Sequence, residues 1–246
     1  MTDDRVPSGY GDRWADVYDE VHAELTVPDE QLDLLTSLAG HGRALELGIG
    51  TGRVALPLAA RGVRIEGLDA SRKMVDRLRA KPGGADLPVT IGDMADVPVE
   101  GQFTLVYVVF NSLFNLLEQA RQVRCFRQVA AVLSPGGTFL LECFVPDLGR
   151  FDRGQSLRTF QVRDDEVRLD ASLHDAVGQT VRSHHITIRD GSVTTWPIHL
   201  RYAWPSELDL MAELAGLRLR SRTGSWSADP FTESSGNHIS VYERPG

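Results

Sequence analysis

The chain has 246 residues and a formal net charge of −8, with only two lysines. This acidic balance argues against a nucleic-acid-binding protein, because such proteins present a basic surface to the phosphate backbone. Neither an apolar leader nor a membrane-length apolar run is found, so we expect one cytoplasmic α/β protein with a small-molecule partner and no nucleic-acid or membrane partner.

Residues 1–40 predict a helical cap ahead of the first strand. Apolar side chains recur up to about His22 at the spacing of one helix face, which predicts one continuous helix there. A second helix is expected after Pro28. The apolar side chains of the first helix are Trp14, Val17, Tyr18 and Val21.

A glycine-rich turn over residues 43–53 separates a short apolar run from a helical pattern. Gly48, Gly50 and Gly52 allow positive φ and let a ligand approach the backbone closely. A dinucleotide-binding turn would need its third glycine where Arg53 stands, and a P-loop would need Gly-Lys followed by Ser or Thr, which is absent. The turn therefore predicts a ligand site of another kind.

Short apolar runs alternate with amphipathic helices over residues 41–150, which is typical of a parallel sheet covered on both faces. Asp69 ends the second strand, where a carboxylate can accept both hydroxyls of a ribose. Gly92, Asp93 and Met94 follow the third strand. The five strands are expected at 44–47, 63–68, 88–91, 103–109 and 138–145.

The spacing Glu46-x-Gly48-x-Gly50-x-Gly52, with Asp69 downstream, resembles the class I S-adenosylmethionine-dependent methyltransferases. This resemblance implies a doubly wound, mostly parallel seven-stranded sheet of the Rossmann-like methyltransferase type. It also implies that S-adenosyl-L-methionine is the cofactor.

The segment from Tyr18 to His22 is similar to the Tyr-Asp-x-Val-His start of the amino-sugar N-methyltransferases, in which the tyrosine lies over the reactive end of the cofactor. Together the two resemblances define the residues that we expect to bind the cofactor. These are Tyr18, Glu46, Gly48, Gly50, Gly52, Asp69, Ala70, Asp93, Met94 and Phe110.

After Pro146 the apolar residues alternate with period two, which predicts antiparallel strands in an insertion over residues 151–204. Asp190-Gly191 is typical of a hairpin turn, and Pro197 predicts that the last strand lies at an edge. Three strands are expected, at 166–174, 180–189 and 193–203.

The insertion resembles the lid or dimerisation sheet of small-molecule methyltransferases, which implies a homodimer. The remaining residues, 205–246, predict a helix and two strands that complete the sheet of the core. We therefore expect four units: a cap over 1–40, a cofactor-binding core over 41–150, the insertion over 151–204 and the completion of the core.

Ligands of open α/β sheets bind beyond the carboxyl ends of the strands, so Asn111 and Asn115 are expected to contact the methyl acceptor. We also expect acceptor contacts from Trp14 and Tyr202. The amino-sugar relatives carry a histidine where Asn115 stands, and this departure leaves both the sugar acceptor and its base open.

A base near the acceptor can speed methyl transfer by removing a proton. We expect this base to be His174, which lies beside Asp175, or His199. No histidine or cysteine has the spacing of a metal site, so no metal is expected.

Three functions remain open. The first is methylation of a nitrogen or oxygen of a small molecule, such as a natural-product or sugar intermediate. In the second, an enzyme of the same fold uses bound S-adenosylmethionine without reaction for a cyclisation or rearrangement. The third is a noncatalytic partner subunit, which we rank last because the glycines and Asp69 are intact.

Overall fold

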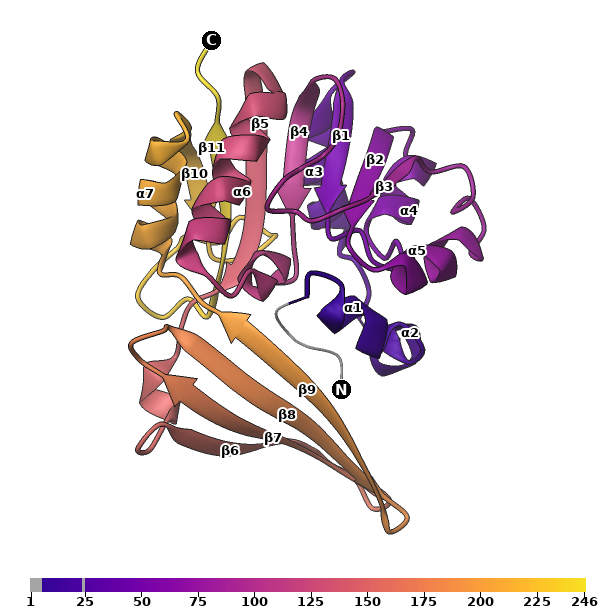
Figure 1. Cartoon of the computed structure of the whole chain (residues 1–246), viewed down its shortest axis with the longest axis vertical. Helices are drawn as coiled ribbons and strands as arrows, with labels where there is room; N and C mark the ends of the chain where they lie inside the picture. The colour runs from indigo at the N-terminus through magenta and orange to yellow at the C-terminus, as the bar shows by residue number, and fades with distance from the viewer. Residues whose placement is uncertain (1–5, 24) are drawn as a thin grey trace.

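A mostly parallel sheet forms the core of the computed structural model, which describes residues 6–23 and 25–246 (Figure 1). Its seven strands have the order β10-β11-β5-β4-β1-β2-β3, and β11 runs antiparallel to both of its neighbours, whereas the other pairs are parallel. The expected doubly wound fold is therefore confirmed. The strands are β1 (Arg43–Leu47), β2 (Arg64–Asp69), β3 (Val89–Ile91), β4 (Phe103–Val108), β5 (Leu133–Phe144), β10 (Arg218–Thr223) and β11 (Asn237–Glu243).

Helices cover both faces of this sheet, because its central strands are apolar on both sides. In β4, Leu105 and Tyr107 pack on the face that α3 and α4 cover, whereas Phe103 and Val106 pack beneath α6 and α7. Among the described residues, no helix is long and apolar enough to cross a membrane. The helices are α3 (Asp29–Ala39), α4 (Ala55–Ala60), α5 (Arg72–Arg79), α6 (Gln119–Val132) and α7 (Pro205–Leu214), with short 3₁₀ helices η1 (Ser112–Asn115) and η2 (Leu148–Arg150).

The insertion is a separate antiparallel sheet of four strands in the order β6-β7-β8-β9. The prediction of three strands was incomplete, because β6 is mostly exposed and an irregularity between Thr159 and Gln161 interrupts its pairing with β7. Neither property produces a period-two apolar pattern. The edge position of β9, with Pro197, is confirmed. The strands are β6 (Gln155–Val162), β7 (Glu166–Asp175), β8 (Thr180–Arg189) and β9 (Ser192–Arg201).

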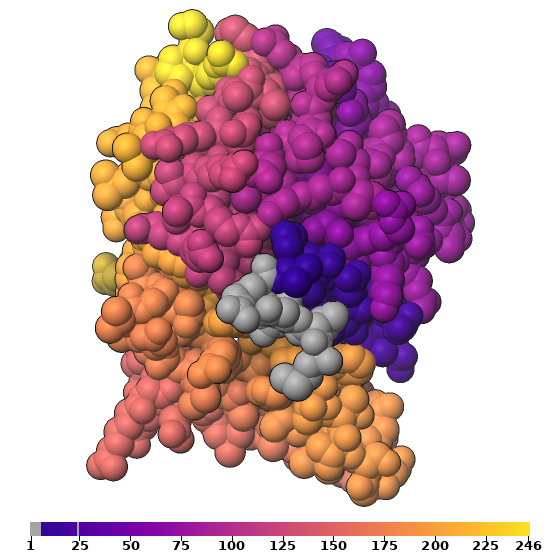
Figure 2. Space-filling model, viewed as in Figure 1, coloured from indigo at the N-terminus to yellow at the C-terminus, as the bar shows by residue number. Residues whose placement is uncertain are grey.

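The N-terminal cap contains two short helices, α1 (Gly9–Trp14) and α2 (Tyr18–Val21), instead of the single helix that the apolar spacing predicted. Val17 breaks the helix with φ −123° and ψ −5°, and its N–H donates to the carbonyl of Trp14 at 3.0 Å. Trp14 at the end of α1 is buried, whereas α2 has no buried residue. In the space-filling view the indigo cap lies between the core and the orange insertion (Figure 2).

Polar contacts hold the cap on the glycine turn. The Asp19 carboxylate accepts hydrogen bonds from Thr51 Oγ1 at 2.6 Å and from Lys81 Nζ at 2.8 Å. Ser71 Oγ donates to Asp12 at 2.7 Å. The cap therefore covers the same edge of the sheet at which β1 and β2 end.

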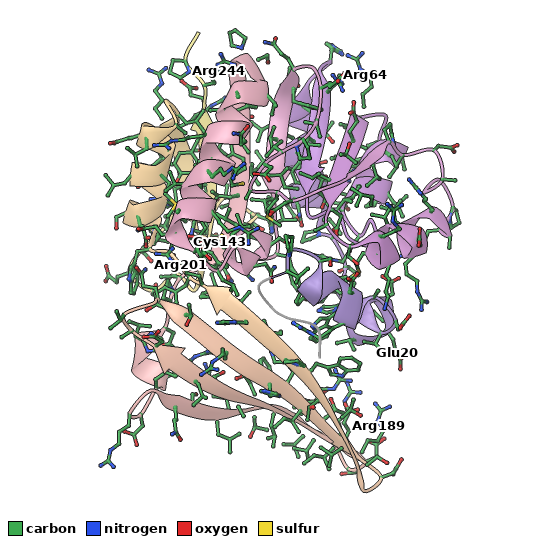
Figure 3. The ribbon with its side chains drawn as sticks, in the orientation of Figure 1. Glu20, Arg64, Cys143, Arg189, Arg201 and Arg244 are labelled. Carbon is green, nitrogen blue, oxygen red and sulfur yellow. The ribbon has the colours of Figure 1, made fainter. Side chains whose placement is uncertain are left out.

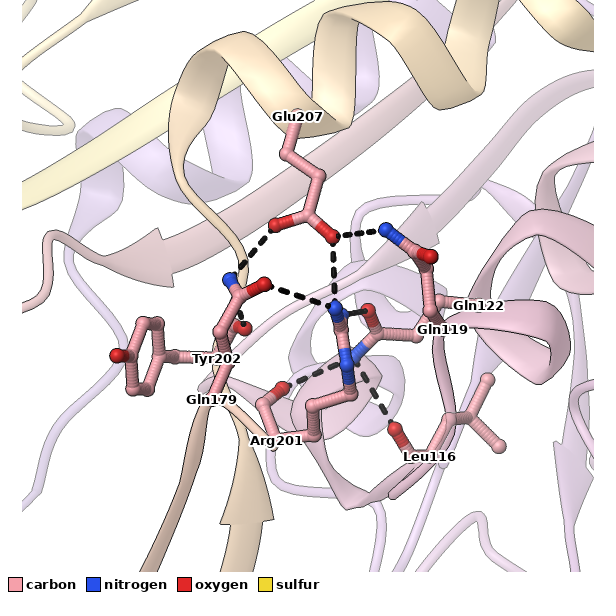
Figure 4. A network of polar contacts seen from close by, with 7 residues as sticks. All are labelled: Leu116, Gln119, Gln122, Gln179, Arg201, Tyr202 and Glu207. Carbon is pink, nitrogen blue, oxygen red and sulfur yellow. Dashed lines mark hydrogen bonds and ion pairs between the residues drawn. The ribbon is translucent and has the colours of Figure 1, made fainter. Parts of the chain in front are cut away.

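A buried polar network centred on Arg201 joins the insertion to the core (Figures 3 and 4). The Arg201 guanidinium donates to Gln122 Oε1 at 2.6 Å on α6 and to Glu207 Oε1 at 2.7 Å on α7. Gln122 Nε2 in turn donates to the carbonyls of Arg201 and Leu116, at 2.9 and 3.1 Å. The network thereby fixes the end of β9 against the loop that follows η1.

We expect the substitution Arg201→Ala to lower the free energy of unfolding by about 3 kcal/mol, because it removes a nearly buried guanidinium that pairs with the partly buried Glu207 carboxylate and leaves the buried Gln122 amide oxygen without its donor. Arg218→Ala is the matched control, since the Arg218 side chain is 70% exposed in its ion pair with Glu243 and should cost less than about 1 kcal/mol. Urea unfolding followed by circular dichroism measures both. Equal losses in the two variants would contradict the assigned role of the network.

Candidate active site

The glycine turn between β1 and α4 exposes its backbone to a cavity. Gly48, Gly50 and Gly52 have φ of 71°, 55° and 81°, which L side chains rarely adopt. A Cβ added to Gly50 would come no closer than 3.9 Å to a protein atom, so it would project into space that a ligand can use. A Cβ on Gly52 would meet Leu78 at 3.0 Å, and this glycine therefore serves packing instead of lining the cavity.

The cavity beside the turn brings together most of the residues expected to bind the cofactor. It lies at the carboxyl ends of β1, β2 and β3, beneath the cap. Three expected residues, Glu46, Gly52 and Phe110, do not line it. Those that do are Tyr18, Gly48, Gly50, Asp69, Ala70, Asp93 and Met94.

Asp69 is held in place by the backbone around it. Its carboxylate accepts the N–H of Gly50 at 2.8 Å and the N–H of Ser71 at 2.7 Å. Burial raises the pKa of Asp69, although these hydrogen bonds oppose the shift. The remaining lone pairs of a rigid, nearly enclosed carboxylate are suited to paired hydroxyl groups.

Glu46 lies behind the glycine turn and not in the cavity. Its side chain is buried and accepts a hydrogen bond from the Tyr107 hydroxyl at 2.9 Å. Burial raises the pKa of Glu46 to about 8, against the opposing effects of Tyr107 and Arg53. In this position Glu46 supports the turn from beneath.

The far end of the cavity combines an acid with apolar side chains. Asp93 accepts the N–H of Ala95 at 2.9 Å and forms an ion pair with Arg121 of α6. Met94 and Leu116 provide flat apolar surface beside this pair. Arg121 was not predicted, because only the tertiary packing of α6 brings it to Asp93.

These residues fit S-adenosylmethionine. The carboxylate of Asp69 is suited to ribose hydroxyls, Asp93 to an exocyclic amine, and Met94 to the face of a base. The glycine turn leaves room for the amino-acid part, which agrees with the space beside Gly50. When bound, the cofactor supplies a methyl group on a positively charged sulfur.

A second cavity, of about 520 Å³, lies between the cap, η1 and the insertion, and all four expected acceptor residues line it. This volume is in the range of small-molecule sites. Phe110 belongs to this cavity and not to the cofactor cavity. The expected acceptor residues are Trp14, Asn111, Asn115 and Tyr202.

The two cavities meet at a junction that consists of Tyr10, Tyr18, Ser112 and Asn115, which line both. A methyl group carried in the first cavity can reach an acceptor in the second only where the two are continuous. The junction is therefore the place where the geometry permits transfer.

Neither histidine expected as a base lines the second cavity. His174 lies behind Tyr202, whose hydroxyl is 2.9 Å from His174 Nε2, and stacks on Phe151. His199 pairs in register with Arg182 on the opposite face of the insertion, because neighbouring residues of a strand point to opposite faces.

Two other histidines and an acid line the second cavity, and the sequence analysis did not single them out. His22 and His185 line the second cavity, and His185 Nε2 lies 3.3 Å from Asp170 Oδ2. Strand alternation places His185 on the same face as Trp196, so the period-two pattern contained a signal for it. His22 belongs to the Tyr18–His22 segment but could not be placed in a cavity without the fold.

The turn after β4 shapes the floor of the second cavity and is strained. Phe110 and Asn111 have φ of 56° and 63°, which is rare outside glycine. Glu142 holds the turn, since its carboxylate accepts the Phe110 N–H at 2.9 Å and Trp226 Nε1 at 3.0 Å. Asn111 Oδ1 accepts the N–H of Phe144 at 2.7 Å, so its side chain also stabilises the turn.

An open groove continues from the second cavity toward the tip of the insertion. It shares Trp14, Phe160 and His185 with the cavity. Glu20 on the cap and Arg189 near the tip border it (Figure 3). The groove shares no lining residue with the cofactor cavity.

We expect Gly50→Ala to weaken S-adenosylmethionine binding at least about tenfold, because the new methyl group occupies ligand space at a positive φ. Gly136→Ala is the matched control: its φ is 74° and no protein atom lies within 4 Å of an added Cβ, but it is remote from both cavities. Isothermal titration calorimetry measures both affinities. Unchanged binding in Gly50→Ala would contradict the assignment of the cofactor cavity.

Comparison with known proteins agrees with this geometry. A family model described as a methyltransferase domain matches residues 44–137. Cypemycin N-terminal methyltransferase from Streptomyces sp is 31% identical in an alignment 248 positions long, which covers 97% of this chain and 98% of that protein.

Solved structures extend the similarity to the insertion and the cap. The CcbJ methyltransferase from Streptomyces caelestis is 40% identical, with a TM-score of 0.90 over 99% of this chain and 100% of that one. DesVI from Streptomyces venezuelae, 23% identical with a TM-score of 0.68 over 94% of this chain and 98% of that one, shares the fold. The chain belongs to the S-adenosylmethionine-dependent methyltransferases.

Proposed function

We propose that this methyltransferase acts on an amine nitrogen of a small molecule, such as a natural-product intermediate. The observation that carries the proposal is the junction of the two cavities. There the second cavity, which we call the acceptor cavity, opens onto the cofactor cavity at Tyr10, Tyr18, Ser112 and Asn115. The chain contributes mainly by positioning, because the leaving group is already activated in the cofactor.

The acceptor cavity is suited to a cation. Rings of Trp14, Phe110, Phe144 and Tyr202 line it, and the faces of aromatic rings attract positive charge. A protonated amine carries such a charge, whereas an alcohol does not. The lining therefore favours nitrogen over oxygen as the methylated atom.

Asp170 provides a negative charge on the wall of this cavity. Burial alone would raise the pKa of Asp170, but hydrogen bonds from His185 and Ser172 outweigh that effect and lower it. Asp170 is thus a carboxylate at neutral pH and can hold an ammonium group.

The two tyrosines of the junction act as neutral hydroxyl groups. Burial raises the pKa of Tyr10 and of Tyr18, so neither becomes a phenolate at neutral pH. As neutral hydroxyls they can donate and accept hydrogen bonds, and their rings exclude water from the point of transfer.

The comparisons support nitrogen as the acceptor atom. The cypemycin relative, by its name, methylates an N-terminus, and it aligns with almost the whole of this chain. The cap and the insertion, which form the acceptor cavity, lie within the aligned part.

The test of the proposed function is incubation with S-adenosylmethionine labelled in its methyl group and a library of primary and secondary amines and matched alcohols. We expect the label in an N-methylated product, with Asp170→Asn lowering kcat/KM at least about tenfold through loss of a charged contact. Asp164→Asn, in an exposed turn, is the control variant. Labelled ethers alone, or full activity of Asp170→Asn, would contradict the proposal.

We also propose that two copies of the chain pair through the outer face of the insertion. Leu157 and Val162 on β6 are each 70% exposed, and Val193 on β9 is 64% exposed. Extended apolar patches of this kind are typical of interaction surfaces, and a sheet face turned away from the acceptor cavity can pair with its own copy without blocking that cavity.

For the homodimer, we expect the wild type to have twice the monomer mass in light scattering and Leu157→Asp to shift toward the monomer. Leu210→Asp is the matched control, because Leu210 on α7 is 60% exposed on a different surface. A monomeric wild type would contradict the dimer, and so would a Leu157→Asp variant that remains dimeric.

A further inference from the structure

His22 is the C-cap residue of α2, and a hydrogen bond to the backbone determines which of its ring nitrogens carries the hydrogen. His22 Nδ1 lies 2.9 Å from the backbone carbonyl oxygen of Tyr18. A carbonyl oxygen can only accept, so Nδ1 must be the donor. In the neutral ring the lone pair is therefore on Nε2, where it is available to take a proton.

The ring of His22 lies beside the junction of the two cavities. It stacks on Tyr18, which belongs to the junction, with the ring centroids 4.3 Å apart. The rings of His22 and Phe110 meet edge to face with their centroids 5.5 Å apart, and the centroid of the Trp14 ring lies 5.9 Å from that of His22. His22 thus lines the acceptor cavity next to the place where the methyl group is transferred.

We propose that His22 is the general base that removes a proton from the acceptor amine, an inference that rests on the proposed function. The proton passes from the ammonium group to Nε2, which frees the nitrogen lone pair. The lone pair then forms the N–C bond with the methyl carbon while the C–S bond breaks, and the electron pair of that bond stays on sulfur. The imidazolium afterwards releases its proton to solvent.

The groups around His22 favour the neutral ring that a base requires. Burial lowers the pKa of His22, and the hydrogen bond to Tyr18 only partly opposes this. The positive charge of Arg53 and the neighbouring His185 lower the pKa further, whereas Asp19 raises it. His22 is accordingly neutral at pH 7.

His185 has a different role because of its partner. Its Nε2 lies 3.3 Å from Asp170 Oδ2 and is directed at this carboxylate. His22 has no such carboxylate contact among the interactions of the described residues. Of the two histidines that line the acceptor cavity in the described part of the chain, His185 is paired with a carboxylate and His22 is not.

The arrangement of His22 is tested first on the whole chain without an acceptor. Nitrogen-detected NMR of the histidine rings, assigned by comparison with His22→Asn, is expected to show hydrogen on Nδ1 and a pKa below the ordinary 6.5. Hydrogen on Nε2, or a pKa at or above 6.5, would overturn the proposal.

The second test uses the amine that acquires the label in the library experiment. His22→Asn keeps an amide donor for the Tyr18 carbonyl but has no base, so we expect kcat at pH 7 to fall by about 100-fold. His41→Asn, an exposed histidine distant from both cavities, is the control. Calorimetry should show unchanged S-adenosylmethionine affinity in both variants.

The pH dependence of kcat distinguishes a general base from a residue with only a structural role. Below the pKa of the amine, each unit of increase in pH makes the free amine about tenfold more abundant. The loss of kcat in His22→Asn relative to the wild type should therefore shrink as pH rises. A deficit that is equal at all pH values would overturn the role of His22. If the wild type yields no N-methylated product at any pH, the proposed function fails instead, whatever the NMR result.

Discussion

The hydrogen bond from the Gly50 N–H to the Asp69 carboxylate, at 2.8 Å, is the contact on which the site depends. It ties the turn after β1 to the end of β2, so that the backbone and the carboxylate face one cavity. Ser71 extends the same connection, since its N–H donates to Asp69 and its hydroxyl to Asp12 of the cap. One set of contacts therefore shapes the cofactor cavity and seats the segment that covers it.

The acceptor cavity depends on elements that are distant in sequence and separate from the main sheet. The ring centroids of Trp14 in the cap and Trp196 in β9 lie 5.4 Å apart, and this contact joins the cap to the insertion beside the cavity. The Arg201 network fixes the other end of β9 to α6 and α7 (Figure 4). The cap and the insertion thus supply much of the lining of this cavity.

Sequence patterns predicted the core well, because its strands are apolar runs buried on both faces and its glycines have unusual backbone angles. They predicted less of the segments whose structure depends on contacts with residues distant in the sequence. The helix break at Val17 follows from docking Trp14 and Asp19 in different places, and strand β6 has too little burial to show a period. The histidines of the acceptor cavity were not identified from the sequence for the same reason, since only the docked cap reveals that His22 reaches the cavity.

The most direct measurement is a crystal structure of the chain with S-adenosylhomocysteine. The account predicts ribose hydroxyls at Asp69, the base beside Asp93 and Met94, and the sulfur at the junction of Tyr10, Tyr18, Ser112 and Asn115, open to the acceptor cavity. A sulfur that points away from this junction, or is closed off from the acceptor cavity, would contradict the account.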